Sequence, residues 1–288
     1  MSQVKVSMTT DFVSDRSFGE HTLKLTAEAG FTHLHWCQHW CDDFIYTQPE
    51  IEYIQQLLSE YKLQLSDTHG SHGVEKCWYS TKEACRLAGV ELVKNRIDFT
   101  QQLGGDAVIV HGPDTHQPDN SFAANLAALN KSLDELEGYA RDRNIKLAIE
   151  NSNHNYKKLL LPVILGRSAE FLGFCYDCGH HNMQVMGETA EQRQVRDEMR
   201  NELAERLMLV HLQDNDGYGD CHWVPFRGEM DWDDVIGFLK LANYKKPLNL
   251  EISYDRTAKL SPMTELEFVQ ESCQAAVKLT EMLAVATK

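Results

Sequence analysis

Short apolar runs alternate with helical patterns along this chain, at intervals of about 36 residues. Several runs are apolar at nearly every position, which is typical of parallel strands that are buried on both faces. There are eight of them, at residues 4–8, 32–36, 63–67, 107–111, 147–150, 173–177, 208–212 and 248–252. Helical spacing is clearest at residues 80–103, 120–143, 231–242 and 264–284. Eight alternating units of this length predict an α/β fold, a single (β/α)8 barrel.

A barrel of this kind uses roughly 250 residues or more as one unit, and the chain has 288. No linker rich in Pro, Gly or Ser divides it, so we expect one domain over residues 1–288. Two alternatives stay open. A helical repeat has a similar period, although the Val- and Ile-rich run in each unit disfavours it. An open, doubly wound sheet is the other, but no GxGxxG motif follows the first predicted strand.

Composition narrows the range of partners. The chain has 28 Lys and Arg against 43 Asp and Glu, a net charge of −15, which disfavours nucleic-acid binding because phosphate contacts need basic surface. The first residues show no secretory pattern, and no apolar run approaches the ~18 residues of a membrane span. Cys175 and Cys178 have CxxC spacing without a second pair, so we interpret this spacing as incidental and expect reduced thiols. We therefore expect a cytoplasmic protein with neither a membrane nor a nucleic-acid partner.

Residues of metal-binding types stand at the ends of seven consecutive predicted strands. Because the active site of such a barrel lies at the carboxyl ends of its strands, these side chains converge on one mouth. Buried without partners they would be costly to desolvate, and a divalent cation removes that cost. We expect a core of four ligands, one from each of the last four strands: Glu150, Asp177, His211 and Glu251. A wider set adds His69, His111, His180, Asp220 and His222.

The mixed oxygen and nitrogen ligands suit Mn, Zn, Co, Fe or Mg, and the alternative is a hydrated polar mouth without metal. Further side chains at or just after strand ends are candidates for substrate binding, because they stand around the same predicted mouth. These candidates are His35, His39, Trp40, His72 and Trp223. Ordinary packing is the alternative for each of them.

Several motifs together resemble the xylose isomerase-like TIM-barrel superfamily, which includes sugar phosphate isomerases/epimerases and endonuclease IV. The motifs are Ala148-Ile149-Glu150-Asn151, Tyr176-Asp177-Cys178-Gly179-His180, Val210-His211-Leu212-Gln213-Asp214-Asn215, the stretch from Asp220-Cys221-His222 to Arg227-Gly228-Glu229-Met230-Asp231-Trp232, and Leu250-Glu251-Ile252. The resemblance implies a divalent-metal-dependent isomerase or epimerase of a sugar, ketose or polyol-derived substrate. It implies that Glu150 and Glu251 also move the proton, through a metal-stabilised enediolate, and that His180 contacts a substrate oxygen. Members of the superfamily often form dimers or tetramers, so a homo-oligomer is a further expectation.

The same resemblance leaves other activities open. Ketose epimerases usually carry a substrate-binding Glu after the fifth-strand ligand and an Arg after the seventh-strand His, where this chain has His154 and Tyr156, and Asp216. Endonuclease IV holds three zinc ions through nine ligands, and residues of all nine types occur here, which makes a multi-zinc phosphodiesterase the main alternative. The net charge of −15 disfavours it. A metal-dependent lyase or dehydratase, and an inactive binding barrel without a tightly bound metal, are the remaining alternatives.

Overall fold

The computed structural model describes residues 4–13, 19–73, 75–113, 122–152, 155–184 and 188–285. Eight parallel strands form one sheet in the order β7-β6-β5-β4-β3-β2-β1-β8. Their bounds are β1 Val6–Thr9, β2 His33–Trp36, β3 Gln64–His69, β4 Ala107–Val110, β5 Lys146–Glu150, β6 Leu172–Asp177, β7 Leu207–His211 and β8 Leu248–Leu250. All eight predicted strands are therefore present, each within two residues of its expected ends.

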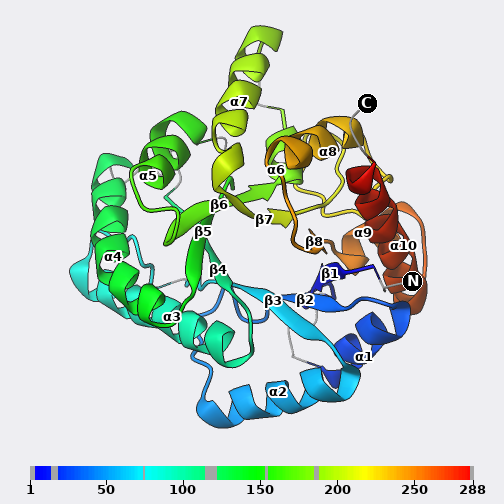
Figure 1. The fold of residues 1–288 in the computed structure, drawn as a ribbon, viewed down its shortest axis with the longest axis horizontal. Helices are drawn as coiled ribbons and strands as arrows, with labels where there is room; N and C mark the ends of the chain where they lie inside the picture. The colour runs from blue at the N-terminus through cyan, green and yellow to red at the C-terminus, as the bar shows by residue number, and fades with distance from the viewer. Residues whose placement is uncertain are drawn as a thin grey trace.

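Helices surround the sheet on its outer side (Figure 1). The longer ones are α1 Glu20–Ala29, α2 Gln48–Tyr61, α3 Glu83–Gln102, α4 Phe122–Asp142, α7 Ala190–Glu202, α8 Trp232–Leu241 and α10 Glu265–Ala284. Shorter ones are α5 Leu161–Leu165, α6 Cys178–Asn182, α9 Tyr254–Leu260, the π-helical turn Tyr156–Leu160 and the 3-10 turn Ala204–Arg206. The four predicted helices are confirmed as α3, α4, α8 and α10, while the predicted start of α4 at Asn120 lies outside the described residues. Parallel strands that alternate with helices along the chain form the (β/α)8 barrel that the sequence predicts.

The barrel closes between β7 and β8 through few backbone contacts. A single parallel bridge joins Leu212 to Leu250. The Leu212 N–H donates to the Asn249 carbonyl at 2.9 Å, and the Glu251 N–H donates to the Leu212 carbonyl at 3.1 Å. Because these bonds lie one residue beyond His211, they set the ends of β7 and β8 side by side.

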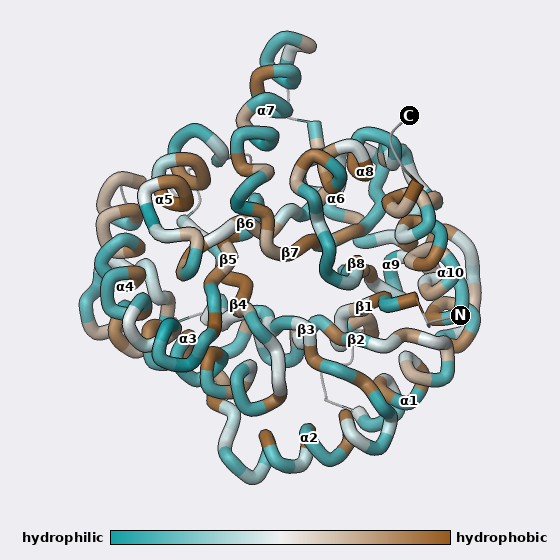
Figure 2. The backbone as a smooth tube through the Cα atoms, viewed as in Figure 1, coloured by the Kyte–Doolittle hydropathy of each residue, from teal (hydrophilic) through white to brown (hydrophobic). Residues whose placement is uncertain are grey.

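The apolar core lies between the strands and the helices. Hydrophobic residues concentrate in the strands, and the helices alternate between hydrophobic and hydrophilic positions (Figure 2). Inside the barrel, Ile109, Ala148, Cys175 and Leu209 form a small apolar cluster. No helix among the described residues has the length and apolar character of a membrane span.

Candidate metal centre at the barrel mouth

Four side chains at the ends of β5 to β8 meet at one point. One ligand atom from each of Glu150, Asp177, His211 and Glu251 lies within 4.8 Å of the others. His211 is central, because its Nδ1 is 3.3 Å from Glu150 Oε2 and 3.1 Å from Glu251 Oε2. All four side chains are buried or nearly so. The core predicted from the strand ends is therefore brought together in space.

Hydrogen bonds between side chains and backbone hold the end of β6 in place beside β5. Asn151 follows Glu150 and pairs with the backbone of Asp177 in both directions, each bond being 2.8 Å long. The Asp177 carboxylate then accepts the backbone N–H of His180 at 2.6 Å and caps α6. Asp177 is thus fixed from both sides, and α6 begins directly at a candidate ligand.

The pKa values in this core reflect competition between burial and neighbouring charge. Burial raises the pKa of Asp177 to about 6, against the opposing effect of His180. Burial is the largest effect on Glu150 and Glu251 and acts in the same direction, but the neighbouring histidines, His211 foremost, together outweigh it and hold the pKa of both below the ordinary range. Burial would lower the pKa of His211, yet Cys175, Glu251 and Glu150 raise it. The core therefore concentrates negative charge that a cation would balance.

A second group of imidazoles lies against Glu150. His111 Nε2 is 3.1 Å and His69 Nε2 is 3.8 Å from Glu150 Oε2. His69 Nδ1 is 2.9 Å from the Gly70 carbonyl, which can only accept, so this nitrogen carries the proton and Nε2 keeps its lone pair. Burial, followed by the effect of His111, lowers the pKa of His69 well below its ordinary value, so the ring stays neutral. A neutral Nε2 beside a carboxylate is the form that binds a metal.

A third group forms where α6 meets the loop after β7. His222 Nε2 is 3.0 Å and His180 Nε2 is 3.4 Å from Asp220 Oδ1, and His180 Nδ1 is 3.0 Å from Glu150 Oε1. The Glu251 carbonyl lies 2.8 Å from His222 Nδ1 and can only accept, so Nδ1 carries a proton and Nε2 faces the Asp220 carboxylate. Burial opposes protonation of His222, but Asp220 raises its pKa to about 9. This residue has φ of 50°, so its approach to Asp220 depends on a left-handed backbone rather than on an extended segment.

The donor set fits a divalent ion. Two ligands about 2.1 Å from one ion, at angles of about 90–110°, are about 3.0–3.4 Å apart, and the contacts of His211 with both glutamates have this length. Yet both ring nitrogens of His211, and Nδ1 of His180, are buried without a hydrogen-bond partner among the described residues. Close approach without hydrogen-bond geometry is expected where the atoms share a cation. The residues present therefore fit a resident metal ion.

The side chains predicted to bind substrate are divided between three places. Trp40 and His72 lie at the edge of the cluster, with the Trp40 ring 4.7 Å from His69 and the His72 ring 5.3 Å from His111. His39 instead stacks on Phe44 at 4.1 Å. Trp223 is half-buried and pairs through its backbone with Asp214 in the loop after β7. Of these aromatic side chains, Trp40 and His72 have the placement that best suits a substrate wall.

His35 lies deeper than its position at a strand end suggested. Its side chain is fully buried, and Nδ1 hydrogen-bonds to Asp67. Its ring is 4.6 Å from that of His211. Asp67 is part of β3, which continues to His69 instead of ending at residue 67. This placement favours support of His211 over direct contact with substrate.

The structure also explains the departures from the epimerase pattern. Tyr156 is fully buried, and its hydroxyl hydrogen-bonds to His181 Nδ1 at 2.8 Å, within the outer core. Asp216 is exposed and accepts the backbone N–H groups of Tyr218 and Gly219 in a turn. His154 lies outside the described residues. Tyr156 and Asp216 thus have structural partners of their own.

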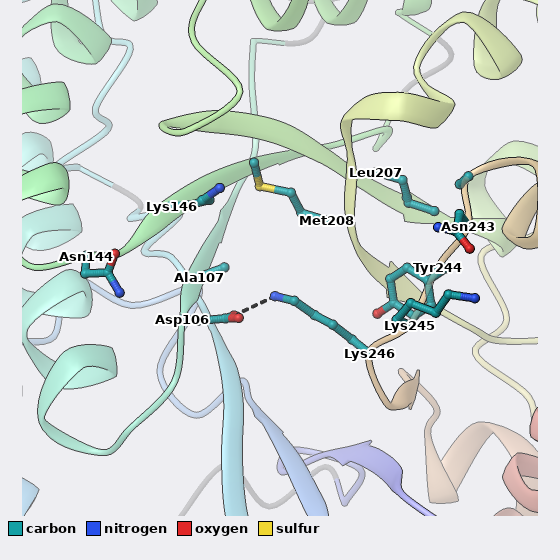
Figure 3. A pocket seen from close by; sticks show the side chains of 11 residues that line it. Asp106, Ala107, Asn144, Lys146, Leu207, Met208, Asn243, Tyr244, Lys245 and Lys246 are labelled. Atoms are coloured by element: carbon teal, nitrogen blue, oxygen red, sulfur yellow. Dashed lines mark hydrogen bonds and ion pairs between the residues drawn. The ribbon is translucent and has the colours of Figure 1, made fainter.

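The opposite end of the barrel, at the amino ends of the strands, has a different set of side chains. A cavity of about 340 Å³ opens there, at the amino ends of β4, β5 and β7 and before β8 (Figure 3). Its lining is Asp106, Ala107, Asn144, Lys146, Leu207, Met208, Ala242, Asn243, Tyr244, Lys245 and Lys246. Its one carboxylate, Asp106, is paired with Lys246 Nζ at 2.6 Å. The convergence of imidazoles and carboxylates is thus a property of the carboxyl end.

An eight-stranded α/β barrel with clustered imidazoles and carboxylates at its carboxyl end defines a class: (β/α)8 barrel proteins whose candidate site lies at the mouth of the barrel. Residues 23–274 match the family model described as Xylose isomerase-like TIM barrel. The chain belongs to this family.

Two relatives align over nearly the full chain. The uncharacterized protein y4fM of Sinorhizobium fredii is 31% identical over 291 residues, which cover 92% of this chain and 90% of that protein. The uncharacterized protein MJ1311 of Methanocaldococcus jannaschii is 24% identical over 97% of this chain and 99% of that protein.

Solved structures share the fold at lower identity. A D-psicose 3-epimerase in the presence of D-fructose has a TM-score of 0.74 and 16% identity, over 98% of this chain and 100% of that one. A D-tagatose 3-epimerase-like protein has a TM-score of 0.72 and 20% identity, over 97% and 98%.

Proposed function

We propose that the protein is a divalent-metal-dependent isomerase or epimerase of a small sugar, ketose or polyol-derived substrate. The observation that carries the proposal is the placement of Glu150 and Glu251, which both approach His211 Nδ1 from different strands. Two carboxylates at one point can take a proton from carbon and return one to it. The solved neighbours named D-psicose 3-epimerase and L-ribulose 3-epimerase support the same class of reaction.

The protein's own groups supply most of this chemistry. A divalent ion held by Glu150, Asp177, His211 and Glu251 would polarise a substrate carbonyl and favour the enediolate. One glutamate accepts the proton from the carbon beside that carbonyl, and the other glutamate donates a proton to the enediolate. Because the pKa of both glutamates is held below the ordinary range, both are ionised before substrate binds, and the donor must first be protonated. Proton return is therefore the step that depends on exchange with solvent or substrate hydroxyls.

The surrounding side chains supply orientation. His180 lies between Glu150 and Asp220, and its position at the mouth supports a role in binding a substrate oxygen. Trp40 covers His69 and His111, where an aromatic face can pack against the carbon skeleton of a sugar. His72 extends the same wall. We assign substrate binding to His180, Trp40 and His72.

The first test is metal content, followed by hydrogen exchange. Protein purified without chelator or metal-binding tag is analysed for elements, and about one Mn, Co, Fe or Mg per chain is expected. The metal-loaded protein is then incubated in D2O with a panel of ketoses and inososes, and deuterium at carbon is followed by NMR. Incorporation into at least one substrate supports the proposal. Metal-loaded protein that incorporates no deuterium into any of them contradicts it.

A multi-zinc phosphodiesterase is the second candidate, because the ligand residues fall into more than one group. His69, His111 and Glu150 form one group, and a separate group consists of His180, Asp220 and His222. About three zinc ions per chain, together with cleavage of abasic DNA, would favour this activity. The net charge of −15 and the expected absence of a nucleic-acid partner disfavour it.

A further inference from the structure

Gln213 lies two residues beyond His211 and is fully buried between two of the ligand groups. Successive residues of an extended strand alternate in direction, so its side chain points the same way as that of His211. Its Nε2 is 3.2 Å from Asp177 Oδ2 and 3.2 Å from Asp220 Oδ1. One amide therefore touches a carboxylate of the core and a carboxylate of the outer group.

The orientation of this amide is fixed by the backbone. The His222 N–H lies 2.8 Å from Gln213 Oε1, and because this N–H can only donate, the oxygen must face it. The NH2 group then faces Asp177 and Asp220, and its two hydrogens match the two carboxylates. The same side chain separates two like charges and holds the loop segment that carries Asp220 and His222.

The helix on the other side is shaped around Gln213. Gly179 is the second residue of α6, next to His180, and a Cβ atom at this position would lie 2.4 Å from Gln213 Cδ. The absence of a side chain at Gly179 therefore lets α6 pack directly on the Gln213 side chain. All three residues of the outer group, His180, Asp220 and His222, thus take their positions from segments that contact Gln213.

We infer that Gln213 is a positioning residue that couples the core Glu150, Asp177, His211 and Glu251 to the outer group His180, Asp220 and His222. It acts through the carboxylates and the loop backbone and does not need to touch substrate. The inference rests on the proposed function only for its catalytic consequence. The structural part of the inference is that the order of the outer group depends on the Gln213 amide. This part holds whichever substrate the protein uses.

The test compares Gln213→Met, which keeps length and removes both polar atoms, with Gly179→Ala, which displaces an intact Gln213. Gln38→Met is the matched control, since Gln38 is also buried but donates to the Thr10 carbonyl instead of a carboxylate. Amide hydrogen exchange of residues 214–223 is measured in metal-free protein, and the visible spectrum of the Co²⁺-loaded protein reports ligand geometry. Both measurements are made without substrate.

Gln213→Met and Gly179→Ala are expected to speed exchange in residues 214–223 by about tenfold or more, since each removes charged hydrogen bonds from the loop. Both are also expected to alter the Co²⁺ spectrum, whereas Gln38→Met does neither. Wild-type exchange and an unchanged Co²⁺ spectrum in both variants would overturn the inference. A wild-type protein inactive on every sugar would contradict the proposed function without affecting this result, so the two failures are distinguishable.

Discussion

His211 is the residue on which the site depends most. Its Nδ1 lies between the carboxylates of Glu150 and Glu251, and its ring packs on His35, which in turn is held by Asp67. Carboxylate–histidine pairs of this kind fix the orientation and tautomer of a ring, and they commonly support metal ligands. The buried, hydrogen-bonded pair His35–Asp67 therefore packs against the candidate ligand His211, and the two glutamates approach its Nδ1.

Replacement of either glutamate by glutamine tests the proton-transfer assignment. Glu150→Gln and Glu251→Gln keep the side-chain shape but remove the basic oxygen, so each is expected to lower deuterium incorporation into substrate by about 10²-fold or more. Circular dichroism is expected to stay native. Glu265→Gln, a change on the surface at the start of α10, is the control and should retain full exchange. Full exchange in both site variants would mean that other groups move the proton.

The sequence predicts that Glu150, Asp177, His211 and Glu251 converge, because each stands at the end of an apolar run that forms a strand, and the structure brings their side chains together. Their role as metal ligands stays a prediction. Gln213 and Asn151 were not predicted, since amides occur everywhere and only their partners reveal them. Side chains alternate in direction along an extended segment, so the residue two positions after His211 points the same way, and this could have indicated Gln213. The full burial of the His35 side chain could not be predicted from the sequence either, because it depends on how far β3 extends past Asp67.

At the scale of elements, helix caps show how local sequence fixes local structure. Thr264 and Glu267 form a reciprocal capping box at the start of α10, in which each side chain accepts the backbone N–H of the other residue. The same arrangement begins α2 at Thr47 and α7 at Thr189. Helix α10 packs against α1, α8, β1 and β8, so it covers the strands on one side of the closure. Its cap therefore contributes to the stability of the barrel.

Thr264→Ala removes the acceptor for the Glu267 N–H and is expected to lower the free energy of unfolding by about 1 kcal/mol. Thr280→Ala in the same helix is the matched control. The Thr280 hydroxyl only donates to the Ala276 carbonyl, and alanine has the higher helix propensity, so its effect should stay within about 0.5 kcal/mol. Urea unfolding measures both. Equal losses of unfolding free energy in the two variants would argue against a stabilising role of the Thr264 cap.

The same box predicts a pH dependence. The backbone N–H and the hydroxyl of Thr264 donate to Glu267 and lower its pKa below the ordinary value of 4.5. A carboxylate with a lowered folded-state pKa stabilises the fold above its unfolded-state pKa, and this contribution is lost as the pH falls below about 4.5. Glu267→Gln should therefore reduce the loss of stability between pH 5 and pH 3, as followed by thermal unfolding. An identical acid profile would exclude the contribution.

At the scale of the whole molecule, the site and the barrel closure coincide. His211 and Glu251 stand on opposite sides of the Leu212–Leu250 bridge, where the ring is held by few backbone hydrogen bonds. A cation bound by both side chains would join β7 to β8 more firmly than the backbone does alone. The fold prediction succeeded because alternating strands and helices specify the barrel, but nothing in the sequence indicates where its ring is weakest.

Removal of metal is expected to lower the melting temperature by about 5 °C or more. This is the size of effect expected for a ligand whose concentration is well above its dissociation constant. The loss of stability on metal removal should be confined to the closure between β7 and β8. The amides of Leu212 and Glu251 should exchange faster in chelator-treated protein, while those of the β4–β5 ladder, such as Val108 and Ile149, change little. Calorimetry and hydrogen exchange check the two parts. A uniform rise in exchange across the barrel would contradict a closure that depends on the ion.

The position of this closure has a consequence for how a newly made chain matures. The core ligands come from four consecutive strands, the last of which, β8, also pairs with β1 through Val6 and Leu248. A nascent chain that has produced β1 to β7 carries three of the four candidate ligands and an open ring, so under the proposed function it would bind an ion weakly. The arrival of β8 completes the ring and the ligand set in one event. Tight ion capture would therefore mark the end of synthesis and folding, and would select the finished molecule over its precursors.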